Sequence, residues 1–239
     1  MKAVIQCGGK GTRLQPYTMV LPKPLMPVQS RPVLELLIVW LRKNDITDIY
    51  ITTGYLGHLI KSYCGDGRQW DVNIKYTEER EPLGTIGPLD KLRDDLDETF
   101  LVINGDVITD LNIFTLSDFH SKKGAVVTIA SSHRDTRMEF GVLEQLGGQV
   151  TEFKEKPMLS YLVSMGVYCM EPSVFKYIPS GAPFGFDDLI YCLLRRRVPT
   201  FTYVHSGIWL DIGRIDDFQR AQELNWDAQV PARVRVNAA

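Results

Sequence analysis

The chain has 239 residues, of which 44% are hydrophobic and 23% charged, with 27 Lys and Arg against 29 Asp and Glu. These proportions are ordinary for a globular protein and exclude a disordered chain, a collagen-like repeat and a disulfide scaffold. The formal net charge of −2 supplies no bulk field for nucleic acid or for an anionic membrane, so we expect neither as a partner. A phosphorylated partner would have to bind local basic side chains and backbone amides.

Strand-length apolar segments alternate with longer segments of helical period, which predicts an α/β layered fold. In the first half of the chain, the expected strands are 3–5, 48–53, 72–77, 100–103 and 125–130, and the expected helices are 32–41, 57–64, 85–96 and 113–123. The strand at 100–103 stops at Asn104, Gly105 and Asp106. The carboxyl end of a strand is where open α/β sheets place ligands.

The pattern changes from Phe140 onward. Residues 140–153 are typical of a hairpin with Gly147 and Gly148 at its turn, and residues 163–170 of a further strand. The remaining expected elements are helices at 172–177, 187–195 and 216–228 and a strand at 200–204. We therefore expect a mixed sheet to which the second half adds antiparallel strands. No linker separates two domains, so a single domain over 1–239 is predicted, with a loose tail at 227–239.

The cysteines and the apolar runs indicate a cytoplasmic protein. Cys7, Cys64, Cys169 and Cys192 are widely spaced, with no CxxC pair and no histidine at ligand spacing. We expect buried thiols in a reducing compartment rather than a zinc site or disulfides. No run approaches the ~20 apolar residues that a membrane span needs, and glycine interrupts the N-terminal segment too early for a secretory signal.

A glycine-rich turn follows the first predicted strand. Gly8, Gly9 and Gly11 would let backbone N–H groups approach a phosphate, and Lys10 and Arg13 add positive charge. The spacing matches neither the dinucleotide-binding GxGxxG motif nor the P-loop. The turn alone leaves two interpretations open, a phosphate cradle or a purely structural turn.

Two further features could add chemistry. Prolines at alternate positions of the PKPLMP segment stiffen the backbone around Lys23, which suggests a cation aimed at a fixed point. Taken alone, the segment is more typical of a solvated lysine in a proline-rich loop. Asp106 and Asp211 each end an apolar stretch, and two carboxylates at strand ends could share Mg²⁺. A simple helix-capping role for Asp106 is the alternative.

The segment FKEKP at 153–157 ends the predicted hairpin with two cations around a carboxylate. On a strand, Lys154 and Lys156 face one way and Glu155 the other. An ordinary charged hairpin end would have the same composition, so the segment by itself does not distinguish a binding site from a solvent-exposed turn.

Taken together, the segments GGKGTRL, PKPLMPV, EPLGTIGPL, NGD, FGV, EKP, MGVY and WLDIG resemble, in this order, the sugar-1-phosphate nucleotidyltransferases. The resemblance is closest to the mannose-1-phosphate guanylyltransferase-like branch and runs from residue 1 to about residue 224. It implies a three-layer α/β/α Rossmann-like fold with a mostly parallel mixed sheet. It also implies a nucleotide-binding half at 1–110, a sugar-phosphate-binding half at 111–226, and no C-terminal β-helix.

The resemblance assigns a role to each matching residue. The residues implied to bind the nucleotide are Gly8, Gly9, Gly11, Thr12, Arg13, Glu79, Gly84 and Thr85. The implied catalytic residues are Arg13 at the leaving pyrophosphate, Lys23 near the α-phosphate, and Asp106 with Asp211 as the Mg²⁺ ligands. Gly141, Glu155, Lys156 and Gly166 would bind the sugar phosphate. One departure is Ser164-Met165-Gly166 where many members have Asn-Ala-Gly, and it leaves the sugar open.

The substrates implied are a nucleoside triphosphate and a sugar-1-phosphate, with a homodimer left open as the assembly. Glu79 is a pure hydrogen-bond acceptor, and guanine offers two adjacent donors where uracil and thymine offer one. GTP is therefore the expected nucleotide, with mannose-1-phosphate or a manno-configured heptose-1-phosphate as the sugar. The alternatives are a uridylyl- or thymidylyltransferase acting on glucose-1-phosphate or an amino-sugar-1-phosphate, and a non-catalytic paralogue that binds NDP-sugar.

Overall fold

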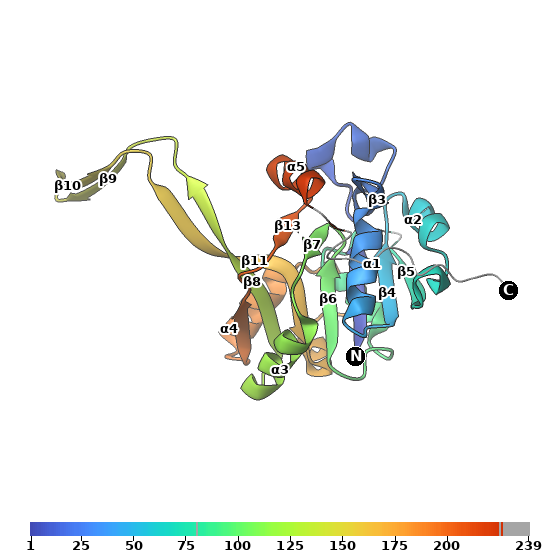
Figure 1. The fold of residues 1–239 in the computed structure, drawn as a ribbon. Helices are drawn as coiled ribbons and strands as arrows, with labels where there is room; N and C mark the ends of the chain where they lie inside the picture. Colours follow the sequence, from blue (N-terminus) through green and yellow to red (C-terminus); the bar gives the residue numbers. More distant parts are fainter. Residues whose placement is uncertain (80, 225, 227–239) are drawn as a thin grey trace.

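The computed structural model describes residues 1–79, 81–224 and 226. Its centre is a seven-stranded sheet in the order β12-β8-β11-β6-β1-β4-β5 (Figure 1). These strands are β1 (Lys2–Cys7), β4 (Asp48–Thr53), β5 (Asn73–Glu78), β6 (Phe100–Asn104), β8 (Val127–Arg137), β11 (Met158–Met170) and β12 (Thr200–Val204). Only β11 runs antiparallel to its neighbours β6 and β8, while the other four pairings are parallel. The predicted mostly parallel mixed sheet is confirmed.

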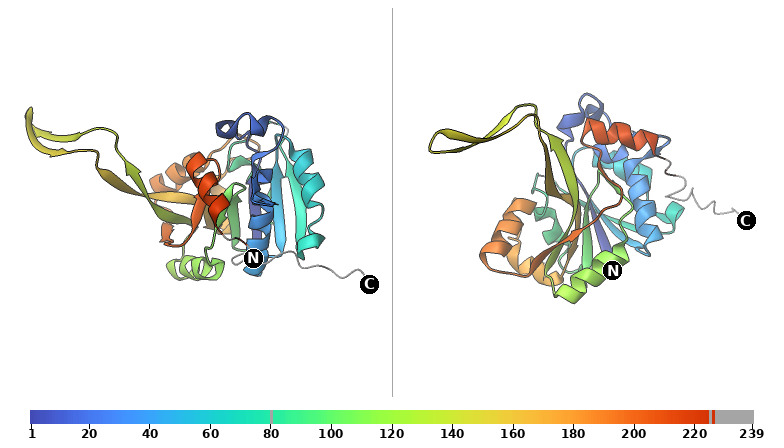
Figure 2. Two further views of the ribbon diagram at one scale, coloured as in Figure 1. Left: turned by 45° about the horizontal axis from the view of Figure 1, so that its top comes forward. Right: turned by 60° about the vertical axis from the view of Figure 1, so that its left-hand side comes forward.

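Helices cover both faces of this sheet, so the central strands are buried at consecutive positions, whose side chains point to opposite faces. Ile5 and Ile51 pack into one core together with the helices α1 (Val33–Lys43), α2 (Gly57–Cys64) and α3 (Ile113–Lys123). Val4 and Tyr50, one residue earlier on the same strands, pack into a second core with α4 (Phe186–Arg195) on the opposite face. The three-layer α/β/α arrangement is therefore confirmed (Figure 2).

Three predicted helices need correction. Residues 85–96 form no α-helix but a 3₁₀-helix over Gly87–Leu92, because Gly84 adopts φ +77° and its loop packs tightly against the backbone of Phe184. Pro172–Tyr177 is also 3₁₀. The last helix, α5 (Ile215–Glu223), ends early because Leu224 is extended. Residues 225, 227 and 228 of the predicted helix, and the predicted tail at 227–239, lie outside the described residues.

The largest departure concerns the strands β8 and β11, which run well past the predicted 125–130 and 163–170. They leave the sheet as a two-stranded ribbon that carries the hairpin of β9 (Val142–Leu146) and β10 (Gln149–Lys154) at its tip. Both figures show this projection, residues 132–163, standing away from the body, and we call it the arm (Figures 1 and 2). The predicted hairpin is confirmed, but its place at the end of an arm was not foreseen.

Smaller elements complete the body. The strands β7 (Val107–Thr109) and β13 (Trp209–Asp211) form one two-stranded sheet, and β2 (Pro27–Val28) and β3 (Arg31–Pro32) form another. All four cysteines are free thiols, and three of them are buried. None of the helices within the described residues is both long enough and apolar enough to cross a bilayer.

Candidate functional site

The glycine-rich turn leaves the carboxyl end of β1 at the centre of the sheet. A Cβ atom on Gly8 would lie 2.5 Å from Glu79 Oε1, and Gly11 has φ +62° with its backbone close to Thr18 and Lys23. Both positions therefore need glycine for packing within the protein. Gly9 differs, since a Cβ atom there would meet nothing within 4 Å. At Gly9 the backbone faces open space, which a ligand could fill.

This turn borders a cavity of about 870 Å³ above the ends of β1, β4 and β6. That volume is within the range of small-molecule sites. Many predicted site residues line it: Gly8, Gly9, Gly11, Thr12, Arg13, Lys23, Glu79, Gly84, Thr85 and Asp106. The structure thus brings the predicted nucleotide-binding residues together.

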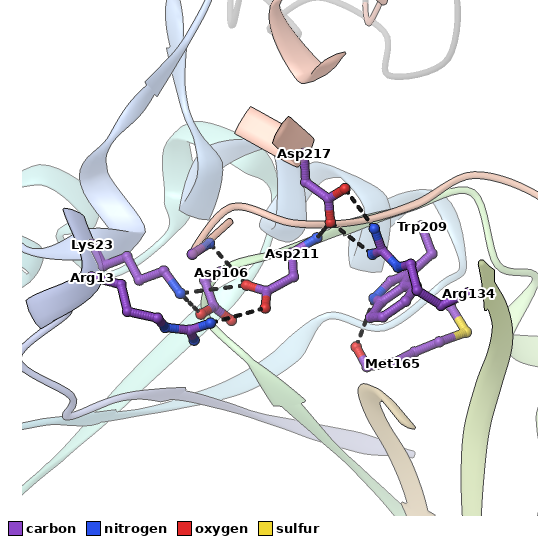
Figure 3. A network of polar contacts seen from close by, with 9 residues as sticks. Arg13, Lys23, Asp106, Arg134, Met165, Trp209, Asp211 and Asp217 are labelled. Atoms are coloured by element: carbon purple, nitrogen blue, oxygen red, sulfur yellow. Dashed lines mark hydrogen bonds and ion pairs between the residues drawn. The ribbon is translucent and has the colours of Figure 1, made fainter. Parts of the chain in front are cut away.

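A network of charges lies at one side of the cavity (Figure 3). The ammonium group of Lys23, only 10% exposed, pairs with the carboxylate of Asp106 and lies 3.5 Å from Asp211 Oδ1. Arg13 Nη1 lies 3.8 Å from Asp211 Oδ2. Asp106 lies in the turn between β6 and β7, and Asp211 is the last residue of β13. The backbone N–H of Ile212 donates to the carbonyl oxygen of Asp106 at 3.0 Å and holds the two segments together. The two aspartates, the lysine and the arginine therefore form one cluster.

Gly213, the last residue of the WLDIG motif, makes room for this cluster, a role that the sequence analysis did not assign to it. A Cβ atom at Gly213 would collide with the ammonium group of Lys23. Its backbone N–H also donates to Asp211 Oδ1 at 2.8 Å. The glycine after Asp211 therefore both orients the carboxylate and admits the cation.

A second, more buried ion pair supports Asp211 from behind. The guanidinium of Arg134 donates to both oxygens of Asp217, at 2.8 and 2.7 Å, and Asp217 Oδ2 accepts the backbone N–H of Asp211 at 3.0 Å (Figure 3). Burial alone would raise the pKa of Asp217, but these hydrogen bonds outweigh it and hold that pKa below its usual value. The guanidinium also lies 4.6 Å from the ring centroid of Trp209, whose Nε1 donates to the carbonyl of Met165.

The opposite side of the cavity is built around Glu79. Its Oε2 accepts the backbone N–H of Leu83 at 3.1 Å, and burial raises the pKa of the carboxyl. The following loop is fixed to the body, since Thr85 Oγ1 accepts the N–H of Phe186 at 2.8 Å and Gln6 donates to the carbonyl of Thr85. A half-buried acceptor is thus held at a defined place beside Gly8.

The predicted sugar-phosphate residues divide into two groups. Gly166, with φ +72°, packs against the side chain of Asn104, which lines the cavity. Gly141, Glu155 and Lys156 lie on the arm, where all three are exposed and Gly141 packs against Phe153 and Glu155. The structure therefore does not bring these three to the cavity of their own chain.

The donor set of the cluster suits a hard divalent cation. Asp106 and Asp211 offer only oxygen atoms, and a cation, the lysine ammonium, already lies between them. In the described part of the chain, no group of three or more His, Cys, Asp or Glu side chains could hold a metal ion. An ion held by the two aspartates would take its other ligands from phosphate oxygens and water.

Comparison with known families agrees with this geometry. The family model described as nucleotidyl transferase matches residues 2–227. The chain belongs to this family. Among the curated relatives of the chain is a UTP–glucose-1-phosphate uridylyltransferase of Synechocystis, 34% identical over 92% of the chain and 62% of the relative. A mannose-1-phosphate guanyltransferase of Candida albicans is 33% identical over 91% of the chain and 62% of the relative. The chain thus spans a little under two thirds of the length of these relatives.

Solved structures show the same fold. A putative glucose-1-phosphate thymidylyltransferase from Bacillus anthracis, in complex with sucrose, superimposes with a TM-score of 0.76 at 30% identity, covering 95% of this chain and 96% of that one. HddC from Yersinia pseudotuberculosis superimposes with a TM-score of 0.75 over 93% and 98% of the two chains, and its 23% identity supports the fold alone.

Proposed function

We propose that the chain is a sugar-1-phosphate nucleotidyltransferase that makes an NDP-sugar and pyrophosphate. The observation that carries this proposal is the cluster of Lys23, Asp106, Asp211 and Arg13 beside the glycine turn, at one end of the sheet. Such a cluster offers cations for phosphate oxygens and two carboxylates for a divalent cation, side by side in one cavity. Family membership supports the same reaction class.

The reaction suits a site without a conventional base. A phosphate oxygen of the sugar-1-phosphate forms a bond to the α-phosphorus of the triphosphate while the bond from that phosphorus to the bridging oxygen breaks and pyrophosphate leaves. Since the attacking phosphate is already ionised at neutral pH, catalysis consists of aligning two repelling anions and neutralising the leaving group. Lys23 would neutralise the α-phosphate, and Arg13, 65% exposed at the cavity, would bind the leaving pyrophosphate.

Asp106 and Asp211 would hold the Mg²⁺ that, when bound, polarises the reacting phosphate as a Lewis acid. The protein itself supplies the geometry of these ligands. The amide of Gly213 and the ion pair of Asp217 with Arg134 fix Asp211, and the N–H of Ile212 ties its strand to Asp106. Lys23 then competes for the same carboxylates, which predicts that the lysine turns towards phosphate when the metal binds.

GTP is the proposed nucleotide. The half-buried Glu79 carboxylate offers only acceptors, which suits the adjacent N1–H and N2 amino donors of guanine. Rice and Candida relatives that are 32% and 33% identical are named mannose-1-phosphate guanyl- or guanylyltransferases, which supports mannose-1-phosphate or a manno-configured heptose-1-phosphate as the sugar. A uridylyl- or thymidylyltransferase acting on glucose-1-phosphate or an amino-sugar-1-phosphate is the second candidate, because the Synechocystis and Bacillus relatives carry those names.

A substrate panel tests these proposals. The protein is incubated with Mg²⁺, one of GTP, UTP or dTTP, and one of several sugar-1-phosphates, and released pyrophosphate is followed. We expect the highest kcat/KM with GTP and a manno-configured sugar, with discrimination against the pyrimidines of up to ~10⁴-fold. Equal or better rates with UTP or dTTP would favour the second candidate. Binding of NDP-sugar without turnover for any pair would instead identify a non-catalytic paralogue.

A further inference from the structure

The arm is a stiff extension that carries polar groups far from the body. Its strands pair continuously from Ser132 with Val163 to Arg137 with Met158, and β12 stops accompanying β8 at Ser131. Six residues of strand beyond Ser131 span roughly 20 Å. Glu155 and Lys156 lie beyond that ribbon, between its end and the tip hairpin. They could reach the cavity of their own chain only if the ribbon were dismantled or folded back.

An ion pair fixes the base of the arm to the body, so that the arm points away from it. Arg134, in the first part of the ribbon, makes its two hydrogen bonds to Asp217 on α5. This pair is largely buried, with Arg134 25% and Asp217 4% exposed. Turning the arm towards its own cavity would break a buried ion pair, which is strongly unfavourable.

The outer arm also exposes an apolar surface that an isolated protein rarely leaves uncovered. Phe140, Leu143, Leu146, Val150, Phe153 and Met158 are between 56% and 79% exposed. Leu143 and Phe153 are direct cross-strand partners, and among the described residues β9 and β10 form a sheet only with each other. A lone two-stranded hairpin is marginally stable in water, and large exposed apolar side chains gathered on one projection are typical of an interface, so we expect a partner to cover them.

The exposed area fits a second copy of the chain. Six large apolar side chains, each exposing roughly 100 Å², give about 600 Å² before backbone and polar atoms are added. A standard interface buries about 800 Å² on each partner. In a twofold dimer the same surface is supplied by both copies, so each arm can cover, and be covered by, the other molecule.

The number of cations at the cavity, compared with the charge of the two substrates, also favours a second copy of the chain as the partner. The cavity lining supplies Lys10, Arg13 and Lys23, and Lys23 is already paired with two carboxylates. A triphosphate and a sugar phosphate together bring more negative charge than these cations can neutralise. On the arm, Lys156 is exposed, has a left-handed backbone at φ +43°, and takes part in no ion pair within the described residues.

We infer that two copies of the chain exchange arms, so that Glu155 and Lys156 of one copy complete the sugar-phosphate site in the cavity of the other. Lys156 neutralises the attacking phosphate, and Glu155 accepts hydrogen bonds from sugar hydroxyls. This inference rests on the proposed function and deepens it, because each active site then contains residues of both copies.

Complementation between two inactive variants tests the exchange directly. Lys156→Ala removes the arm cation, and Asp106→Asn removes a carboxylate of the cavity. When the two are co-expressed, half of the dimers are mixed, and each mixed dimer has one site with an intact cavity and an intact arm. We expect about a quarter of wild-type turnover from the mixture. As a control, Lys156→Ala with Glu155→Ala gives no gain, since both defects lie on the arm. Turnover of the first mixture no greater than that of either variant alone would overturn the exchange.

Molar mass measured by light scattering provides a readout that does not depend on activity. We expect the wild type at twice the chain mass of 27.2 kDa. Leu143→Glu with Phe153→Glu should give monomers that bind nucleotide but turn over at least ~10-fold more slowly. Phe114→Glu, at a phenylalanine on α3 that is more exposed than Phe153, should remain dimeric and active. A monomeric wild type would overturn the inference. A dimeric wild type that makes no NDP-sugar would instead refute the proposed function.

Discussion

The ion pair between Arg134 and Asp217 gives a prediction whose size follows from its burial. Replacing Arg134 by Met removes both guanidinium hydrogen bonds and leaves the Asp217 carboxylate, 4% exposed, accepting the backbone N–H of Asp211 (Figure 3). Breaking a buried pair by removing one partner costs about 3–5 kcal/mol of unfolding free energy. Because Arg134 is itself 25% exposed, we expect the lower end, about 3 kcal/mol.

Removing both charges should cost less than removing one. In the double variant Arg134→Met with Asp217→Leu no charge is left unpaired, and the main loss is the acceptor for the Asp211 amide, about 1 kcal/mol. For a chain of this size, 3 kcal/mol corresponds to a fall in Tm of roughly 6–12 °C. Arg42→Met is the matched control, because Arg42 and Asp45 form an exposed pair at 3.9 Å that contributes less than about 1 kcal/mol.

The turnover of the Arg134→Met variant is the second measurement. Asp217 orients the backbone of Asp211, and a displacement of about 1 Å at a reacting group can cost ~10²-fold. We expect Arg134→Met to lower kcat far more than it changes the KM for nucleotide, with partial rescue by Arg134→Lys. Thermal unfolding and pyrophosphate release measure the two effects. A single variant that melts within about 2 °C of the wild type, or a double variant less stable than the single, would refute the reasoning.

Four further predictions use the same assays. The pKa of Asp217 is held low, so the stability advantage of the wild type over Arg134→Met is present at neutral pH and is lost as pH falls through that lowered pKa. Asp106→Asn and Asp211→Asn each lower turnover by about two orders of magnitude or more while the far-UV circular dichroism is unchanged. Gly213→Ala displaces the Lys23 ammonium and lowers kcat, whereas a normal kcat would show that the lysine position is unimportant. Because burial raises the pKa of Glu79, the KM for GTP rises as pH falls through that raised value, and Glu79→Gln removes this pH dependence.

Much of the fold could be predicted because the strands and helices obey simple periods. The helix α1 has buried Leu34, Leu37, Ile38 and Leu41 at helical spacing, and β1 and β4 are segments of strand length that each contain a short apolar run, at 3–5 and 49–51. The prediction of an α-helix at 85–96 was wrong because the conformation of this segment depends on contacts with Phe184, almost a hundred residues away in the sequence. The outer part of β8 was not predicted because its polar residues do not alternate with apolar ones. These residues form a strand only because they pair with β11.

The candidate site was predictable where a residue ends an apolar strand, as Asp106 and Asp211 do. The ion pair that orients Asp211 could not be predicted, because Arg134 and Asp217 are separated by 83 residues and neither belongs to a local sequence pattern. Glu155 and Lys156 show a different limit. The sequence indicates what they could bind, whereas the direction of the arm decides in which copy of the chain they would bind it.

We propose that Asp106, Asp211 and the glycine turn together join a nucleoside triphosphate to a sugar-1-phosphate. Phosphorus NMR of one reaction mixture tests it most directly, because substrates and both products have separate resonances. We expect the sugar-1-phosphate signal to be replaced by equal amounts of NDP-sugar and pyrophosphate, only with Mg²⁺ and not with Asp106→Asn. Release of pyrophosphate without NDP-sugar, or equal conversion by Asp106→Asn, would contradict the account.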